Sequence, residues 1–334
     1  MSLAKVLEQP AVIPCTPPVT PTPTPPAISA FKYKFGDEGY LLDYHGTRVM
    51  YPMYESLPVV ERFEADKKDI CIVTFPKSGT HFMGAIVWMI LHDGEPSSLL
   101  EGDVLDGKVP WLEYSMPGMK ANMLPAHTMT GQEGPRVFFT HLGYNALPES
   151  IKTQAKVIYV ARNPKDVIVS ANYFFRALTF TGCSHTMEET IQSFKNNTCV
   201  YAPYFDHVAG YRRKVSDMTN LFFATYEEMV QNLENAVKGV AGFLGKQLTD
   251  AQIANIVRYC SHAEMKVNGV TSHIHLHKLG LMDFNIAPFM RKGIIGDWKE
   301  HFSPELNRQV DEWIEQEEDR VQHDLKGFRF QYEA

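Results

Sequence analysis

The chain has 334 residues, a hydrophobic content of 44% and a formal net charge of −7 at pH 7. This length and composition fit one sizeable globular domain, and the acidic balance argues against a nucleic-acid partner. No run of about 18 apolar residues occurs, so we expect no membrane span. The five cysteines form no CxxC pair, which is typical of free thiols in a reducing compartment and favours a cytoplasmic location.

Residues 1–30 are unusually rich in proline, which alternates with threonine and valine. This composition is typical of a disordered or polyproline-like tail, and it lacks the basic and apolar regions of a signal peptide. Residues 14–17 and 23–26 have the spacing of PxxP ligands, but a tail without a dedicated partner is the simpler interpretation. We therefore predict a tail over residues 1–30 and one domain over residues 31–334.

From residue 31 onward, short apolar runs alternate with segments of helical periodicity. The predicted strands cover residues 70–75, 137–140, 156–160 and 221–225. The predicted helices lie near residues 80–92, 164–178, 186–199, 226–243, 249–261 and 303–318. Because strands separated by helices form parallel sheets, we predict an α/β fold: a single domain with a central parallel β-sheet flanked by helices.

Residues 74–82, Thr-Phe-Pro-Lys-Ser-Gly-Thr-His-Phe, follow the first predicted strand and open the first predicted helix. Backbone N–H groups at a helix start converge on an anion, and Lys77 adds a positive charge to them. Gly79 lets the backbone approach closely, while Ser78 and Thr80 add hydroxyl groups. A Walker A loop would place its lysine after a second glycine, so a nucleoside triphosphatase is disfavoured. The pattern predicts a P-loop-like site for an oxyanion.

Two further segments carry groups suited to phosphate. Arg162 follows the strand at 156–160, at the sheet edge where α/β proteins bind ligands, and Ser170 lies two helical turns further on. Residues 289–299 place Arg291 and Lys292 before a glycine, within apolar neighbours that favour a packed loop. Each segment alone could be an ordinary surface ion pair or a solvated basic pair, so the interpretation depends on their occurring together.

Together the three motifs resemble those of the cytosolic sulfotransferases, in the same order and with the same flanking strands. Weaker similarity to this family extends from about residue 43 to residue 313 and includes residues 109–114, 140–142 and 223–229. The resemblance implies sulfation: a sulfuryl group moves in line from 3′-phosphoadenosine 5′-phosphosulfate (PAPS) to a hydroxyl or amine. The implied acceptor is a small lipophilic phenol, steroid or alcohol, and the implied product of the donor is PAP.

The resemblance also implies roles for individual residues. His141, after the strand at 137–140, is the implied base for the acceptor, and Lys77 is the implied partner of the leaving oxygen. The residues implied to bind PAPS are Lys77, Ser78, Gly79, Thr80, His81, Phe82, Arg162, Ser170, Tyr201, Cys260, His262, Met265, Phe289, Met290, Arg291, Lys292 and Gly293. The residues implied to line the acceptor pocket are Trp111, Tyr114, Tyr173 and Phe174, under a lid formed by residues 266–288.

Four positions depart from the family pattern. Phe82 stands where the family has tryptophan, and Cys260 and His262 replace a threonine and a phenylalanine near the adenine. Phe139 replaces a lysine, which removes a cation beside the sulfuryl group. A catalytically weak protein that binds nucleotide or lipophiles therefore stays an alternative. A nucleotide-kinase-like phosphotransferase is a second alternative, although the Walker lysine that it requires is absent.

Two features of the last third of the chain bear on metals and assembly. His273, His275 and His277 alternate in the implied lid, but metal ligands normally come from several elements with carboxylate or cysteine support, so we predict no metal. Family dimers use a segment in which this chain has Pro304 for valine and Arg308 for glutamate. Both changes disfavour that contact, so we predict a monomer or a weak homodimer.

Overall fold

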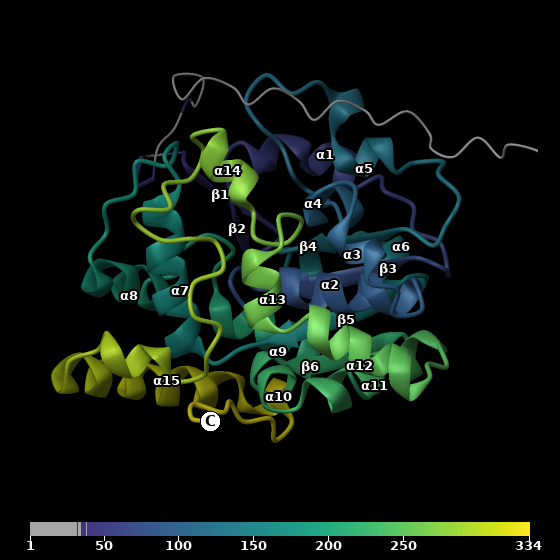
Figure 1. Ribbon diagram of the computed structural model, residues 1–334. Helices are drawn as coiled ribbons and strands as arrows, with labels where there is room; N and C mark the ends of the chain where they lie inside the picture. Colours follow the sequence, from purple (N-terminus) through teal and green to yellow (C-terminus); the bar gives the residue numbers. More distant parts are fainter. Residues whose placement is uncertain (1–31, 33–34, 38) are drawn as a thin grey trace, which may run out of the picture.

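The computed structural model describes residues 32, 35–37 and 39–334, so the predicted tail over residues 1–30 lies outside the described residues. Its centre is a four-stranded parallel sheet in the order β4-β3-β5-β6 (Figure 1). These strands are β3 (Ile70–Thr74), β4 (Val137–Thr140), β5 (Lys156–Ala161) and β6 (Leu221–Thr225). A separate antiparallel hairpin joins β1 (Leu41–Tyr44) to β2 (Thr47–Met50). The predicted α/β fold with a central parallel sheet is confirmed.

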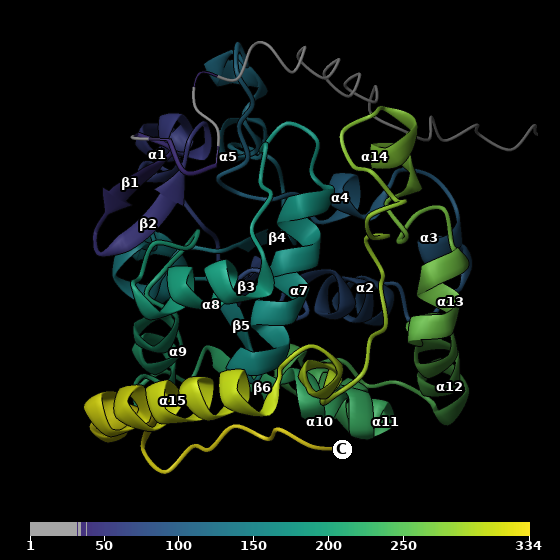
Figure 2. The ribbon, with the colours of Figure 1, turned by 90° about the vertical axis from the view of Figure 1, so that its left-hand side faces the viewer.

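Helices cover both faces of this sheet, and each face has its own apolar core. The main helices are α2 (Thr80–Leu91), α7 (Pro164–Ala177), α8 (Met187–Lys195), α9 (Tyr204–Arg212), α10 (Tyr226–Gln231), α11 (Leu233–Leu244), α12 (Asp250–Tyr259), α13 (His262–Val267) and α15 (Pro304–Leu325). Shorter helices are α1 (Leu57–Val60), α3 (Ser97–Leu100), α4 (Leu105–Lys108), α5 (Pro125–Thr128), α6 (Glu149–Thr153) and α14 (Ile274–Lys278). In Figure 2, α15 runs across one end of the molecule, against α9.

The two cores follow from the period of two in the strands. In β5, Tyr159 points into the core that contains α7, α8, α9 and α15, while Ile158 and Val160 point into the core that contains α2, α11 and α12. All the residues of β3 are buried, as expected for a strand covered on both faces. This two-sided burial explains why the strands were recognisable as continuous apolar runs.

The helices differ from the prediction in several places: α9 and α13 were not predicted, and the helix predicted at 186–199 ends at Lys195. The helix predicted at 226–243 is divided into α10 and α11 at Asn232, whose backbone is not helical and whose side chain accepts a hydrogen bond from the Asn235 N–H over 3.0 Å. Helix α15 continues to Leu325, beyond the predicted end near residue 318. Among the described residues, we find no helix with the length and apolarity that crossing a membrane requires.

Three parallel strands end at the same edge of the sheet and supply the groups of the predicted site. Strand β3 leads to the loop that contains Lys77, β4 leads to His141 and β5 leads to Arg162. Because parallel strands point their carboxyl ends in one direction, residues far apart in sequence meet at this edge.

Candidate active site

The loop between β3 and α2 has an unusual backbone that only certain residues can adopt. Lys77 and Gly79 both have positive φ angles, of 71° and 108°. A Cβ atom at Gly79 would lie only 2.8 Å from the ring of Tyr226, so the position requires glycine for space as well as for conformation. The Ser78 hydroxyl is buried and makes no hydrogen bond within the described structure. It is therefore a polar group that a bound anion could satisfy.

The Lys77 ammonium lies between two aromatic rings at the opening of this loop. Its Nζ is 3.8 Å from the centre of the Phe174 ring and 4.6 Å from that of Phe289. Burial, together with the nearby charges of Arg162 and Arg291, lowers the pKa of Lys77 to about 7. An anion in the cleft would counter these charges and favour the protonated lysine.

His141 is held by hydrogen bonds that leave one ring nitrogen available. Its Nδ1–H donates to the carbonyl oxygen of Thr74 over 2.8 Å. Because a carbonyl oxygen only accepts, Nε2 is the unprotonated nitrogen and is able to take a proton. The His141 backbone is fixed as well: its N–H donates to Glu113 Oε1 over 2.8 Å, and its carbonyl accepts from His207 Nε2 over 3.0 Å. Burial lowers the pKa of His141 to about 3, so the imidazole is neutral near pH 7.

Aromatic side chains surround the His141 ring. The ring centres of Trp111, Tyr201 and Phe139 lie 5.2, 5.3 and 5.5 Å from it. Phe139 stacks on Trp111 at 5.9 Å, which makes this wall apolar. Tyr201 was implied to bind the nucleotide, but these contacts place its ring beside the base. The Tyr201 ring therefore packs against His141 and Trp111.

Arg162 lies beside the loop and contacts Tyr226, which the sequence did not single out. One guanidinium N–H donates to the Lys77 carbonyl over 3.0 Å, and the guanidinium carbon is 4.2 Å from the centre of the Tyr226 ring. Tyr226 also meets Phe82 at 6.1 Å, edge to face. The signal for Tyr226 was its position directly after the strand at 221–225, within the segment that resembles the family.

The third motif is ordered by acidic side chains. Asp166 accepts hydrogen bonds from the backbone N–H groups of Gly296 and Trp298, over 2.8 and 3.1 Å, and so attaches the loop to α7. Asp297, which is 2% exposed, forms ion pairs with both Arg291 and Lys292. The two cations that were implied to bind phosphate are thus paired with this carboxylate, which a phosphate would have to replace.

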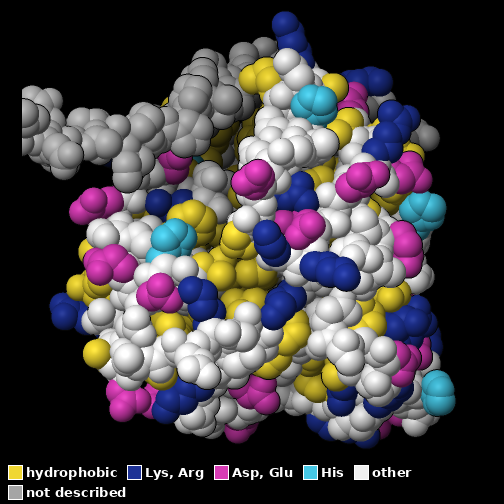
Figure 3. Space-filling model, turned by 90° about the vertical axis from the view of Figure 1, so that its right-hand side faces the viewer, with side chains coloured by type: hydrophobic (Ala, Val, Ile, Leu, Met, Phe, Trp, Pro, Cys, Tyr) yellow, Lys and Arg dark blue, Asp and Glu magenta, His cyan; other side chains and the backbone are white. Residues whose placement is uncertain are grey.

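One cleft of about 1900 Å³ contains most of the predicted site residues. Those that line it are Lys77, Gly79, Thr80, His81, Phe82, Trp111, Tyr114, His141, Arg162, Ser170, Phe174, Tyr201, His262, Met265, Phe289, Met290, Arg291, Lys292 and Gly293. This volume exceeds the 300–1,000 Å³ typical of a pocket for one small ligand, so donor and acceptor have room side by side. The face drawn in Figure 3 shows apolar side chains in a hollow with lysine and arginine at its edges.

Three predicted residues lie outside the cleft lining. Cys260 is fully buried, with its thiol 3.7 Å from the Met89 sulfur, so its assignment as a direct cofactor contact is corrected. Tyr173 was assigned to the acceptor pocket, but it does not line the cleft, and its ring centre lies 4.7 Å from the guanidinium carbon of Arg291. Adjacent residues of a helix point in different directions, which is why Phe174 reaches the cleft and Tyr173 does not. Ser78 is buried just beneath the loop surface.

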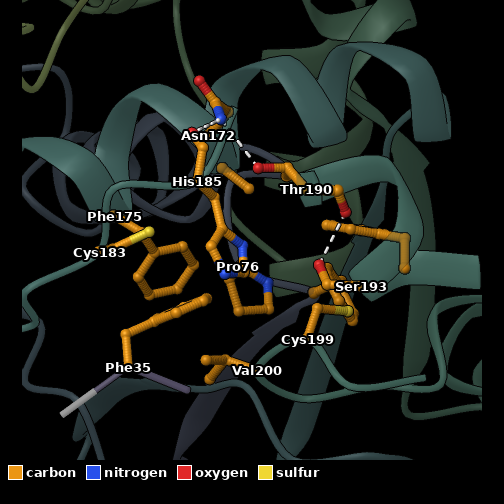
Figure 4. A pocket seen from close by; sticks show the side chains of 13 residues that line it. Phe35, Pro76, Asn172, Phe175, Cys183, His185, Thr190, Ser193, Cys199 and Val200 are labelled. Carbon is orange, nitrogen blue, oxygen red and sulfur yellow. Dashed lines mark hydrogen bonds between the residues drawn. The ribbon is translucent and has the colours of Figure 1, made fainter. Parts of the chain in front are cut away.

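A second cavity lies behind the loop and is much smaller, at about 20 Å³ (Figure 4). Phe35, Pro76 and Phe175 line it, and its polar groups bond to one another: Asn172 Nδ2 donates to Thr190 Oγ1 over 2.8 Å. This volume is about that of one water-sized probe, so the cavity is part of the packing beneath the loop and does not hold a substrate.

Comparison with known proteins decides the family. The family described as "Sulfotransferase domain" matches residues 67–323, which is most of the chain. The chain belongs to this family. The assignment confirms the predicted class of enzyme, a PAPS-dependent sulfotransferase.

Individual relatives and solved structures agree with the assignment. Sulfotransferase 1B1 of Mus musculus is 36% identical over 268 residues, covering 80% of this chain and 88% of that protein. Amine sulfotransferase of Oryctolagus cuniculus is 31% identical over 283 residues, covering 83% and 90%. The structure of mouse sulfotransferase SULT7A1 complexed with PAP has a TM-score of 0.66 and 27% identity, covering 86% of this chain and 98% of that one. Retinol dehydratase in a complex with retinol and PAP has a TM-score of 0.77, 21% identity and coverage of 91% and 94%, which shows a shared fold.

Proposed function

We propose that this sulfotransferase transfers the sulfuryl group of PAPS in line to a hydroxyl or amine of a small lipophilic acceptor. The observation that carries the proposal is the placement of His141 Nε2, the Lys77 ammonium and the Arg162 guanidinium around one cleft at one sheet edge. A base, a cation for the leaving group and a second anion site are the parts that such a transfer requires.

The donor end is supported by polar groups that have no partner of their own. The Ser78 hydroxyl and the Arg162 Nε are both buried without a hydrogen bond in the described structure. Buried orphan donors are unfavourable, and an anionic ligand at the loop would satisfy them. The first N–H groups of α2, from Thr80 onward, add donors that no intrahelical bond uses. When bound, PAPS supplies the activated sulfuryl group, and Phe82 with Tyr226 would flank its base.

The 3′-phosphate is assigned to Arg162, Ser170, Arg291 and Lys292. All four line the cleft, but Arg291 and Lys292 are paired with Asp297, so binding requires an exchange of partners. Charge-assisted contacts to phosphate are stronger than neutral ones, which favours this exchange when several donors act together.

The acceptor end is supported by the apolar wall around the base. Trp111, Tyr114 and Phe174 line the cleft, and the rings of Trp111 and Tyr201 pack against that of His141. In this position His141 Nε2 would take the proton of the acceptor as the new bond to sulfur forms, while Lys77 would neutralise the leaving oxygen. One relative is an amine sulfotransferase, which supports a small acceptor that carries an amine without selecting one.

Phe139 favours one alternative, a weakly catalytic member of the fold that binds nucleotide or lipophiles. Its side chain is 3% exposed and stacks on Trp111, so this wall of the cleft carries no charge. The test is a screen of phenols, steroids, alcohols and amines with radiolabelled PAPS, using His141→Ala as the control. Transfer by the wild type that the variant lacks supports the enzyme, whereas stoichiometric binding of PAP without any transfer would favour the alternative.

Assembly and location stay predictions. Pro304 is the first residue of α15, and Arg308 forms ion pairs within that helix with Glu305 over 2.8 Å and Glu312 over 2.6 Å. Neither side chain therefore offers the apolar or acidic contact that valine and glutamate provide in the dimer segment of the family. We propose a monomer or weak homodimer in the cytoplasm. Light scattering at micromolar concentration tests the first, and a stable dimer that Pro304→Val leaves unchanged would mean that another surface is used.

A further inference from the structure

Three side chains from separate elements meet at the edge of the cleft beside Phe139. His81 lies in the first turn of α2, Asp106 lies in α4, and His273 directly precedes α14. His81 Nε2 is 2.8 Å from Asp106 Oδ1, and His273 Nδ1 is 3.3 Å from Asp106 Oδ2. The donor atoms of all three residues lie within 4.8 Å of one another. Nitrogen and carboxylate donors therefore form one cluster, in which His81 and Asp106 share a hydrogen bond.

His273 is the member of this cluster that the protein itself does not satisfy. It is fully buried, yet neither of its ring nitrogens makes a hydrogen bond in the described structure. The contact with Asp106 Oδ2 is close but does not have hydrogen-bond geometry. His275 Nδ1 is a further buried nitrogen without a partner, and its ring centre is 5.5 Å from that of His273. An unsatisfied buried imidazole is unfavourable, so its retention here suggests a ligand.

The spacing suits a transition-metal ion. In a tetrahedral zinc site with bonds of roughly 2.0–2.1 Å, neighbouring donor atoms lie roughly 3.3 Å apart. The separations of 2.8 Å from Asp106 Oδ1 to His81 and 3.3 Å from Asp106 Oδ2 to His273 are close to this value, and the donor atoms of the three residues lie within 4.8 Å of one another. Imidazole nitrogens with one carboxylate suit zinc and similar ions, whereas magnesium and calcium prefer oxygen ligands alone.

Asp106 supplies a negative charge that would balance part of an added positive charge. The Phe289 ring contacts both Lys77, the cation of the loop, and the two imidazole rings of the cluster. That ring lies 4.6 Å from Lys77 Nζ and 3.9 and 4.8 Å from the rings of His273 and His81. The backbone of His81 remains available at the start of α2, so its implied role in the loop is not displaced.

We propose that His81, Asp106 and His273 form a binding site for a divalent transition metal of the zinc class, with His275 within reach as a further ligand. This replaces the expectation of no metal. That expectation rested on alternating histidines from one segment, whereas the folded chain adds a carboxylate from α4 and an imidazole from α2. An ion bound here would tie the segment before α14, which belongs to the implied lid, to the first turn of α2.

The test is a calorimetric titration of the chelator-treated full chain with Zn²⁺ in the absence of PAPS. We expect one saturable site in the wild type, and an affinity at least about 100-fold weaker in Asp106→Asn and in His273→Ala, because even outer-shell partners of a metal are worth 10–100-fold. His277→Ala is the matched control: His277 belongs to the same run of histidines, but it is exposed and its Nδ1 lies 3.1 Å from the Met282 carbonyl oxygen. This control should bind Zn²⁺ like the wild type.

A second measurement separates loss of a ligand from loss of structure. Co²⁺ bound by nitrogen and oxygen ligands absorbs in the visible region, with an intensity that distinguishes tetrahedral from octahedral coordination. We expect the tetrahedral spectrum in the wild type and in His277→Ala, and its absence in Asp106→Asn with an unchanged far-ultraviolet circular dichroism spectrum. Asp297, Glu300 and His301 form a second group of possible metal ligands. The Glu300→Gln variant tests this group and should bind Zn²⁺ and Co²⁺ like the wild type.

Several outcomes would overturn the inference. They are equal Zn²⁺ affinity in the wild type and both ligand variants, loss of the site in His277→Ala or Glu300→Gln, or no saturable binding by the folded wild type. Because the titrations contain no sulfuryl donor and no acceptor, they succeed or fail independently of the proposed sulfuryl transfer.

Discussion

Replacement of His141 by alanine tests the proposed mechanism most directly. The substitution removes Nε2, the only unprotonated nitrogen that the hydrogen bond to Thr74 leaves on this ring. It keeps the backbone N–H and carbonyl of residue 141, which are bound by Glu113 and His207. The cleft should therefore keep its shape while losing its base.

The expected loss of turnover follows from the role of a general base. Removal of such a base typically costs about 10²–10⁴-fold, which corresponds to about 2.7–5.4 kcal/mol in the activation free energy. Burial lowers the pKa of His141 to about 3, and a base of low pKa contributes less, so we expect the lower half of this range. Loss of the Nδ1–H bond to Thr74 should also lower the free energy of unfolding by about 1 kcal/mol.

The assay pairs steady-state turnover with calorimetric binding of PAP. We expect His141→Ala to bind PAP with nearly wild-type affinity, because the residue belongs to the acceptor side, and to recover part of its activity when imidazole is added. Turnover close to that of the wild type with a hydroxyl acceptor would refute the assignment of the base. Equal losses of turnover and PAP affinity would show instead that the substitution disturbs the whole cleft.

Three further predictions concern the donor side. Lys77 must be protonated to bind an anion, and its pKa is lowered to about 7. A pH profile of kcat/KM for PAPS should therefore be level below pH 7 and fall above it. A profile that stays level up to pH 9 would contradict this reasoning. Arg291→Ala should weaken PAP binding by about 1.5–3 kcal/mol by calorimetry, as expected for a charged hydrogen bond, and less if Asp297 competes strongly. Gly79→Ala should lower both the melting temperature and the affinity for PAP. A φ of 108° costs a residue other than glycine about 1–3 kcal/mol, and the added Cβ would meet the Tyr226 ring. An unchanged melting temperature would argue against this loop conformation.

The sequence by itself determined the four strands of the central sheet, several helices around it, and the loop that follows β3. The strands were recognisable because burial on both faces requires continuous apolar residues, and the loop was recognisable because its backbone requires Gly79. Once the strands were known to be parallel, the convergence of Lys77, His141 and Arg162 at one edge followed from topology alone. These features depend on local chemistry and on one rule of chain connection.

Only the tertiary structure decided which side chains face the cleft and which partners they have. Cys260 is turned into the core, Tyr226 rather than Tyr201 packs beside Arg162, and Asp297 holds Arg291. The direction of a side chain on a helix and its contacts with distant segments depend on packing, which the order of residues does not specify locally. The same holds for His81, Asp106 and His273, which lie far apart in the sequence. They meet because α2, α4 and the segment before α14 pack together, and no sequence motif predicts this contact.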